Sequence, residues 1–239
     1  MVKANPISVL ITCEHAANRV PKEYRHLFIG HEDTLNSHRG WDAGALQLAR
    51  TLASRLDAPL LTGDYTRLLV DLNRSRGHSA RFSEFTRHLH TEEREAISSI
   101  WWQPHWRDFQ DHLHQLPDRI LHIACHSFTP VFNGHRRKTD IGLLYDPTRP
   151  SEKAFCFRYG QALKRNFPAL KIHMNQPYRG ISNNIGQQYR KHFPDAKLMT
   201  FELEINQRLV DGPNWNGLCN RIVDVTSERI AGEHFETIL

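Results

Sequence analysis

Histidine and glutamate residues lie at the end of, or within, three apolar runs of this chain. Glu14 and His15 directly follow one run, and His126 ends another. Neutral imidazoles and carboxylates bind zinc in hydrolytic sites, where a water molecule takes the fourth position. Glu202 and Glu204 lie inside a third apolar run, on one face of a predicted strand. Burying an unpaired carboxylate costs free energy, so we expect at least one of the two to reach a cleft.

Asp42 is a further candidate for this chemistry. Its position favours capping of the helix predicted to follow it, and the alternative is a carboxylate ligand that completes a set of His, Asp and His. A glutamate next to a metal-activated water is suited to act as a general base. Each histidine taken singly also fits a turn or a hydrogen-bonded core position, because the chain has 16 histidines.

The segment 65–75, YTRLLVDLNRS, carries side chains suited to bind an anion. Arg67, Asn73 and Arg74 surround a short apolar run within it. A guanidinium beside an amide donor can hold two oxygens of a substrate carboxylate. Asp71 could instead neutralise either arginine, so a set of exposed ion pairs is the alternative.

The elements that must position these residues alternate between buried strands and amphipathic helices, a pattern typical of an α/β domain. Strands are predicted at 7–13, 60–62, 68–72, 120–126, 141–145 and 198–205, and helices at 42–56, 91–116, 152–167 and after Pro213. Ligands of open α/β sheets bind at the carboxyl ends of strands. We therefore expect the polar residues around positions 15, 73, 126 and 204 to converge on one edge of a sheet.

Composition excludes several classes of protein. The 239 residues are 39% hydrophobic and 24% charged, which fits one domain over residues 1–239 and excludes a disordered, collagen-like or coiled-coil chain. Apolar runs are far shorter than the ~18 residues of a membrane span, and residues 1–10 lack the apolar stretch of a secretory signal. We therefore expect a cytoplasmic protein without a membrane partner. The cysteines form no C-x-x-C pair and are predicted to be buried thiols: Cys13, Cys125, Cys156 and Cys219.

The formal net charge of +5 suggests an anionic partner. The longest basic run is only residues 136–138, and acidic residues are interleaved along the chain. This distribution favours a small anionic substrate over a nucleic acid. A nucleic-acid-binding protein is the less favoured alternative, and it depends on the charge and on Trp101, Trp102 and Trp106, whose helical spacing is more typical of a core.

Seven short segments contain the residues discussed above. They are EHAANRVP (14–21), HRGWDAGA (38–45), YTRLLVDLNR (65–74), HSFTP (126–130), DIGLLYD (140–146), NQPYRG (175–180) and FELEINQRL (201–209). In this order they resemble the N-formylglutamate amidohydrolase family and, through it, zinc carboxypeptidase-like and aspartoacylase-like hydrolases. The resemblance implies a single α/β domain of the phosphorylase/hydrolase-like type, with a central mixed sheet flanked by helices. It also implies one zinc ion per chain.

The same resemblance suggests the metal ligands. His15 takes the place of the first ligand and His126 that of the last. In the carboxypeptidase-like relatives, the carboxylate ligand follows the first histidine by three residues, where this chain has Asn18. Asp42 is therefore our candidate for that ligand, with Asn18 and Glu14 as alternatives.

Substrate contacts follow from two other segments. The DLNR segment resembles the carboxylate-binding Asn-Arg pair of those relatives, which implies that Asn73 and Arg74 hold the substrate and that Arg67 assists. Arg179 in NQPYRG resembles a second substrate contact, although a turn after Pro177 is the alternative.

The choice of general base depends on which relative is compared. Glu204 matches the pattern of the formylglutamate hydrolases, and Glu202 matches the TFEL segment of the carboxypeptidases. We prefer Glu204 as the base and keep Glu202 as the alternative.

The implied activity is zinc-dependent hydrolysis of the amide bond of an N-acyl amino acid, a reaction of amino-acid metabolism. The simplest substrate is N-formyl-L-glutamate, which would give formate and L-glutamate. Those relatives often have an aspartate two residues before the last histidine, where this chain has Ala124. With Asn18, this difference leaves open a metal-free family member that binds an acidic metabolite.

Overall fold

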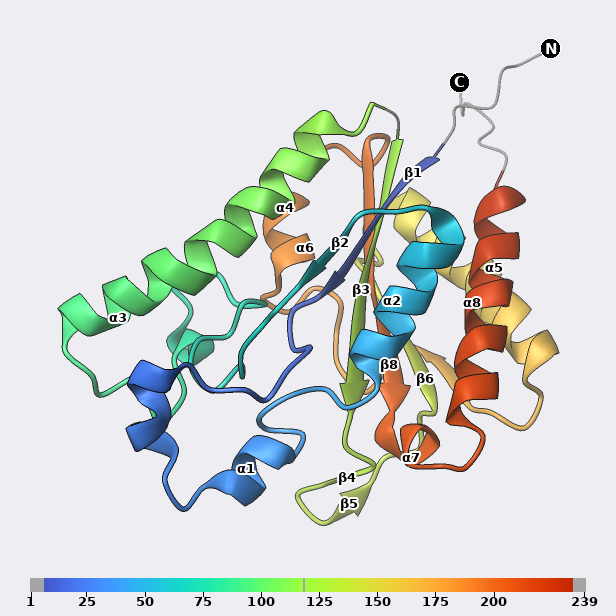
Figure 1. Ribbon diagram of the computed structural model, residues 1–239. Helices are drawn as coiled ribbons and strands as arrows, with labels where there is room; N and C mark the ends of the chain where they lie inside the picture. Colours follow the sequence, from blue (N-terminus) through green and yellow to red (C-terminus); the bar gives the residue numbers. More distant parts are fainter. Residues whose placement is uncertain (1–6, 118, 234–239) are drawn as a thin grey trace.

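Six strands form one mixed sheet at the centre of the protein (Figure 1), in a computed structural model that describes residues 7–117 and 119–233. Their order across the sheet is β2 (Leu60–Thr62), β1 (Ile7–Cys13), β3 (Arg119–Phe128), β8 (Leu198–Asn206), β6 (Ile141–Leu144) and β7 (Ile172–Met174). The first four run parallel, β6 runs antiparallel to β8, and β7 runs parallel to β6. The predicted mixed sheet is confirmed.

Helices cover both faces of this sheet. One face packs on α2 (Ala45–Leu56), α5 (Pro150–Asn166) and α8 (Trp215–Ala231), and the other on α4 (Gln103–Gln115) and α6 (Ile185–Tyr189). Side chains alternate between the two faces along each strand. On β3 this alternation sends Leu121, Ile123 and Cys125 into the larger core, and it places His122 and His126 together on the opposite side.

The remaining elements are short and lie outside the sheet. They are α1 (Glu32–Asn36), α3 (Thr91–Ile97), α7 (Gln207–Val210), a π-helical turn (Ser98–Trp102), 3-10 turns at Lys22–Phe28 and Ser79–Arg81, and the two-stranded hairpin of β4 (Val131–Phe132) and β5 (His135–Arg136). The helix predicted over 91–116 is therefore α3 and α4, joined by the π-helical turn just before Pro104.

One predicted strand is wrong. Residues 68–72 form an irregular loop, not a strand. The apolar side chains of Leu69, Val70 and Leu72 are buried because they pack in a separate cluster with Phe82 and Trp102. Burial in this cluster explains the apolar run without any pairing to the sheet.

The prediction that Asp42 caps the following helix is also wrong. Helix α2 begins at Ala45, and the residue before it is Gly44, which has a left-handed backbone with φ of 79°. A side chain at Gly44 would also collide with Val210. This glycine separates Asp42 from the helix, so the carboxylate is available for another role.

Other expectations are settled for the described part of the chain. All four cysteines are buried and unpaired, as predicted. Among the described residues, no helix has the length and apolar character that crossing a bilayer requires. The predicted domain span of 1–239 includes ends that lie outside the described residues.

Candidate active site

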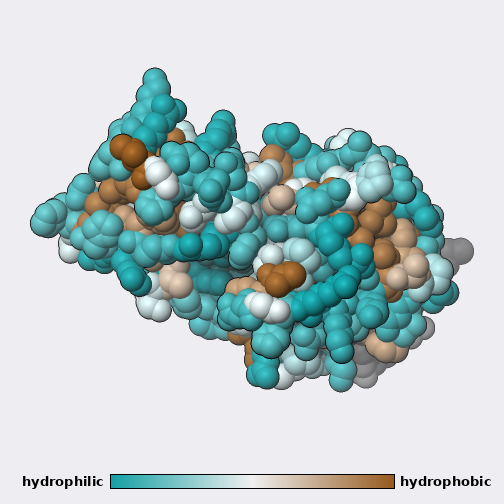
Figure 2. All heavy atoms as spheres, turned by 90° about the horizontal axis from the view of Figure 1, so that it is seen from below, coloured by the Kyte–Doolittle hydropathy of each residue, from teal (hydrophilic) through white to brown (hydrophobic). Residues whose placement is uncertain are grey.

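The carboxyl ends of three parallel strands bring distant polar residues to one edge of the sheet. In the register of β3 and β8, His126 lies opposite Glu204, and Ala124 lies opposite Glu202. His15 follows the end of the adjacent strand β1 by two residues. Figure 2 shows this end of the molecule, which is mostly hydrophilic and hollowed near its middle.

A cleft of about 200 Å³ opens at this edge. All nine side chains predicted to take part in the site line it: His15, Asp42, Arg67, Asn73, Arg74, His126, Arg179, Glu202 and Glu204. The structure thus brings together residues from six of the seven segments, although the role of each stays a prediction.

Several lining residues were not expected from the sequence. They include His38, Tyr178, Ser182, Asn183 and Asn184. His38 and Tyr178 lie within segments that were recognised, HRGWDAGA and NQPYRG, so the motifs contained a signal for both. The other three lie in an irregular stretch between β7 and α6, where no periodic pattern marks a residue as functional.

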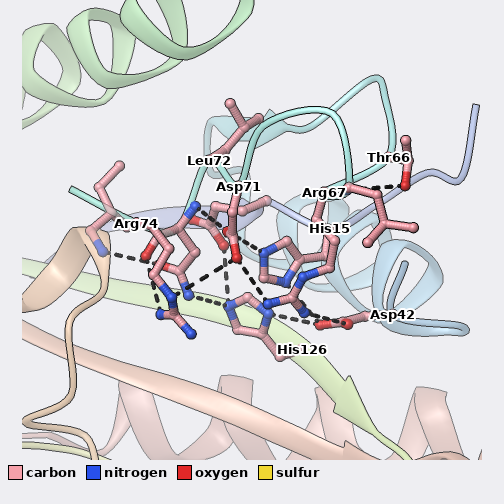
Figure 3. A network of polar contacts seen from close by, with 12 residues as sticks. His15, Asp42, Thr66, Arg67, Asp71, Leu72, Arg74 and His126 are labelled. Carbon is pink, nitrogen blue, oxygen red and sulfur yellow. Dashed lines mark hydrogen bonds and ion pairs between the residues drawn. The ribbon is translucent and has the colours of Figure 1, made fainter. Parts of the chain in front are cut away.

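The two strand-end histidines meet at one carboxylate (Figure 3). Oδ2 of Asp42 lies 3.3 Å from Nδ1 of His15 and 2.9 Å from Nδ1 of His126. All three side chains are buried, and their candidate ligand atoms lie within 4.8 Å of one another. Ligands of a tetrahedral zinc ion are separated by about 3.3 Å, because each lies about 2.0–2.1 Å from the metal. Donor types and spacing therefore fit a zinc ion.

The other two candidates for the carboxylate ligand lie elsewhere. Asn18 donates a hydrogen bond to Oδ1 of Asn36 on an exposed part of the surface. Glu14 contacts Nε2 of His126, at 3.2 Å, whereas Asp42 contacts Nδ1. A single ion cannot bind at both nitrogens of one ring, so the geometry favours Asp42.

Charges around this cluster keep Asp42 ionised. Burial by itself would raise the pKa of Asp42, but His15, His126 and Arg67 lower it well below its usual value. The pKa of His126 is raised, because Asp42 and Glu14 outweigh the effect of burial. The charged carboxylate of Asp42 is suited to bind a divalent cation, and such a cation would displace the proton that these carboxylates favour on His126.

Asp71 fixes the orientation of His15. Its Oδ1 lies 2.8 Å from Nε2 of His15, so the Nδ1 atom of the ring faces Asp42. Asp71 also accepts a hydrogen bond from Arg67 at 3.0 Å. Burial opposes ionisation of Asp71, but Arg67 and His15 hold its pKa well below the usual value. Sequence reasoning had assigned Asp71 only to an arginine, and it missed this contact.

The two glutamates of β8 differ in their hydrogen bonding. Oε1 of Glu202 accepts a hydrogen bond from the Asn73 amide at 3.0 Å. Glu204 is only 5% exposed, and its Oε2 atom has no hydrogen-bond partner among the described residues. Burial, with smaller contributions from Asp42 and Glu202, raises the pKa of Glu204 to about 8. Glu204 is therefore the carboxyl group better placed to exchange a proton near neutral pH.

The loop before Arg74 is held by two tryptophans and by α6. Nε1 of Trp106 donates to the carbonyl oxygen of Leu72, and Nε1 of Trp102 donates to that of Arg74, both at 2.8 Å. Oδ1 of Asn73 accepts from the backbone N–H of Ile185 at 3.0 Å. These contacts fix Asn73 and Arg74 at the cleft although no strand carries them.

The arginines of the cleft have different partners. Arg67 pairs with Asp71 and, at 3.5 Å, with Asp42, so its charge is already balanced by carboxylates. Arg74 donates to the carbonyl oxygen of Asn183 and lies 3.9 Å from Asp71. Arg179 also lines the cleft. The lining of the cleft thus contains positive charge that could bind an anion.

Residues 7–210 match the N-formylglutamate amidohydrolase family. This chain belongs to that family. The match covers the strand ends, the loop of residues 65–75 and both glutamates of β8, so it includes every residue of the cleft described above. Membership indicates an amidohydrolase, in agreement with a site built from imidazoles, carboxylates and arginines.

Solved structures resemble this fold. A gene product from Agrobacterium tumefaciens superposes with a TM-score of 0.77 at 25% identity, covering 95% of this chain and 90% of that one. A succinylglutamate desuccinylase from Chromobacterium violaceum gives a TM-score of 0.46 at 13% identity, covering 95% and 61%. A metallo-carboxypeptidase from Burkholderia cenocepacia gives 0.44 at 12% identity, covering 96% and 58%. No curated protein matches the sequence significantly.

Proposed function

We propose that this protein is a zinc-dependent amidohydrolase that cleaves the amide bond of an N-acyl amino acid. The simplest substrate is N-formyl-L-glutamate, and water would convert it to formate and L-glutamate. The observation that carries the proposal is the meeting of His15, Asp42 and His126 at one point inside a cleft that also contains arginines.

His15, Asp42 and His126 would hold the ion in this proposal. Zinc bound there would polarise the acyl carbonyl group and make water more acidic. The three side chains are buried and anchored from several directions, which keeps the donors oriented before substrate arrives.

Glu204 is the proposed general base. It would accept a proton from the attacking water and then deliver a proton to the leaving amine nitrogen. One of its oxygens has no hydrogen-bond partner in the part of the chain that the structure describes, and its pKa is raised. Both features suit the two steps, because the group can be charged or neutral near neutral pH. Glu202 is the less favoured base, because the Asn73 amide already donates to it.

Arg74, with Asn73, would hold the α-carboxylate of the substrate. Holding the substrate at a fixed distance from the base converts an encounter into an oriented reaction. Arg179 is proposed to contact a second polar group of the substrate, and Arg67 to keep Asp42 and Asp71 ionised and in place.

A panel of N-acyl amino acids tests this proposal. N-formylglutamate, N-acetylaspartate, N-formylaspartate and N-formylmethionine are each incubated with metal-free and zinc-loaded protein, and release of the free amino acid is measured. We expect hydrolysis only by the zinc-loaded protein, with N-formylglutamate the best substrate. Saturable binding of these compounds without hydrolysis would support a metal-free binding protein instead.

A further inference from the structure

Glu14 is a buried carboxylate that the proposed reaction does not use. It is 1% exposed, and its one ion pair among the described residues is with Nε2 of His126 at 3.2 Å. Neither of its oxygens has a hydrogen bond of regular geometry within the part of the chain that the structure describes. Burying a carboxylate with so little compensation is costly. The charged partner of this buried carboxylate is therefore a ring nitrogen of a candidate metal ligand.

The surroundings of His126 identify what Glu14 can do. Three groups face Nε2 of this ring: Glu14 at 3.2 Å, the amide nitrogen of Asn73 at 3.4 Å, and Glu202 at 3.8 Å. The amide nitrogen can only donate, so its contact with Nε2 needs the ring proton on Nδ1. When the ring proton is on Nε2, a carboxylate must accept it. Glu14 is therefore the nearest acceptor for an Nε2–H group, and Nδ1 is left facing Asp42 at 2.9 Å.

The face of the sheet that carries His126 also carries a row of polar side chains. Thr12 lies on β1, two residues before Glu14. Its hydroxyl contacts Nε2 of His122 at 2.9 Å, and Nδ1 of His122 contacts the hydroxyl of Thr200 at 2.7 Å. A polar row across β1, β3 and β8 thus lies on the face that His126 shares with His122.

We propose that Glu14 is the positioning residue of His126: it accepts the Nε2–H proton and so presents Nδ1 to the metal ion. Glu14 and Asp71 then act alike, each holding the outer nitrogen of one histidine while the inner nitrogens share Asp42. This inference rests on the proposed function, because it assigns Glu14 a role toward the ion that His15, Asp42 and His126 would bind.

Zinc affinity is the decisive measurement, by competition with a chromophoric chelator. Glu14→Gln keeps the size of the side chain but removes its charge, and we expect it to bind zinc about 10–100-fold more weakly than wild type. Glu233→Gln is the matched control, because Glu233 is a buried carboxylate that pairs with Arg158 and Arg229 away from the cleft. We expect it to bind zinc as wild type does.

The outcomes separate this inference from the proposed function. If wild-type protein binds no zinc, the proposed function itself is wrong. If wild type binds zinc and Glu14→Gln binds it equally well, only the role of Glu14 is wrong. Should Glu14→Gln fail to fold, nitrogen NMR of zinc-loaded wild type decides: the inference requires metal at Nδ1 of His126 and a proton at Nε2, and metal at Nε2 overturns it.

Discussion

The two halves of the cleft are built in different ways. Of the candidate metal ligands, His126 lies within β3 and His15 follows β1 by two residues, and pairing between these two parallel strands fixes the backbone of both. Asn73 and Arg74 lie on an irregular loop that is held from outside, by indole N–H groups and by α6. The sheet positions the residues proposed to do chemistry, and the loop positions those proposed to hold the substrate.

This difference predicts which substitutions should affect the reaction and which should affect substrate binding. A loop held by side-chain contacts can change its shape while the edge of the sheet stays intact. Substrate preference can therefore change while the proposed catalytic residues at the sheet edge keep their positions. We therefore expect substitutions in the strand-end half to reduce the rate of the chemical step, and substitutions in the loop half to weaken substrate binding.

Loss of a metal ligand should have the largest effect. We expect His126→Ala to lower kcat/KM by about 10³-fold or more, because an ion that contributes several kcal/mol would no longer be held. Metal content and activity are measured on the same sample. His173→Ala, at a histidine of β7 that does not line the cleft, is the control, and it should keep its zinc. A His126→Ala variant with normal turnover would contradict the assignment.

Glu204→Gln should come next. We expect kcat to fall by about 10²–10⁴-fold, since a general base contributes that much, while zinc content and KM change little. Steady-state kinetics with metal analysis checks this. Glu202→Gln is the matched comparison from the same strand and should lose less. A larger fall in kcat for Glu202→Gln than for Glu204→Gln would indicate that Glu202 is the general base.

Arg74→Ala tests the loop half. A hydrogen bond to a charged group is worth about 1.5–3 kcal/mol, so we expect KM for N-formylglutamate to rise about 10–150-fold. Zinc content should not change. If kcat falls and KM does not, Arg74 acts on the chemical step and the division between the two halves is wrong.

The raised pKa of Glu204 makes stability of the zinc-free protein depend on pH. The folded protein keeps a proton on Glu204 between pH 4.5 and about 8, whereas the unfolded chain releases it. This contribution is complete below pH 4.5 and is lost as the pH rises through about 8. Wild type should therefore lose stability relative to Glu204→Gln by at most about 1.4 kcal/mol per pH unit in that range. Urea unfolding with a chelator measures the difference, and parallel pH profiles would contradict it.

Trp106→Phe should have the smallest effect. It removes the N–H donor to the Leu72 carbonyl, worth about 0.5–1.5 kcal/mol, so we expect KM to rise only a few-fold. Trp215→Phe removes a similar bond, to Gln47, on the other face of the sheet and should leave KM unchanged. Equal effects of the two variants on KM would show that the indole bond does not hold the loop.

Most of the sheet, and the proximity of His15 to His126, could be predicted from the sequence. Apolar runs such as Ile7–Cys13 correspond to buried strands, and parallel strands bring their carboxyl ends together. The apolar run 68–72 was wrongly predicted to be a strand. Its side chains are buried in a cluster beneath a loop, and such burial gives the same apolar pattern in the sequence as burial in a strand. The left-handed Gly44, which separates Asp42 from α2, has no periodic signal either.

The partners of the histidines were the least predictable part. Glu14 and Asp71 were both noticed as residues, but their contacts depend on which ring nitrogen faces which carboxylate. Such orientation arises only from the three-dimensional packing of β1, β3 and the 65–75 loop. Residue type and spacing can therefore indicate a set of ligands without indicating what orients them.

Anomalous diffraction at the zinc edge, from a crystal of zinc-loaded protein, is the most direct test of the cation site. We predict one peak per chain, about 2.0–2.2 Å from Nδ1 of His15, Nδ1 of His126 and a carboxylate oxygen of Asp42. A well-ordered crystal with no peak between these three side chains, or with zinc bound only elsewhere, would contradict the prediction.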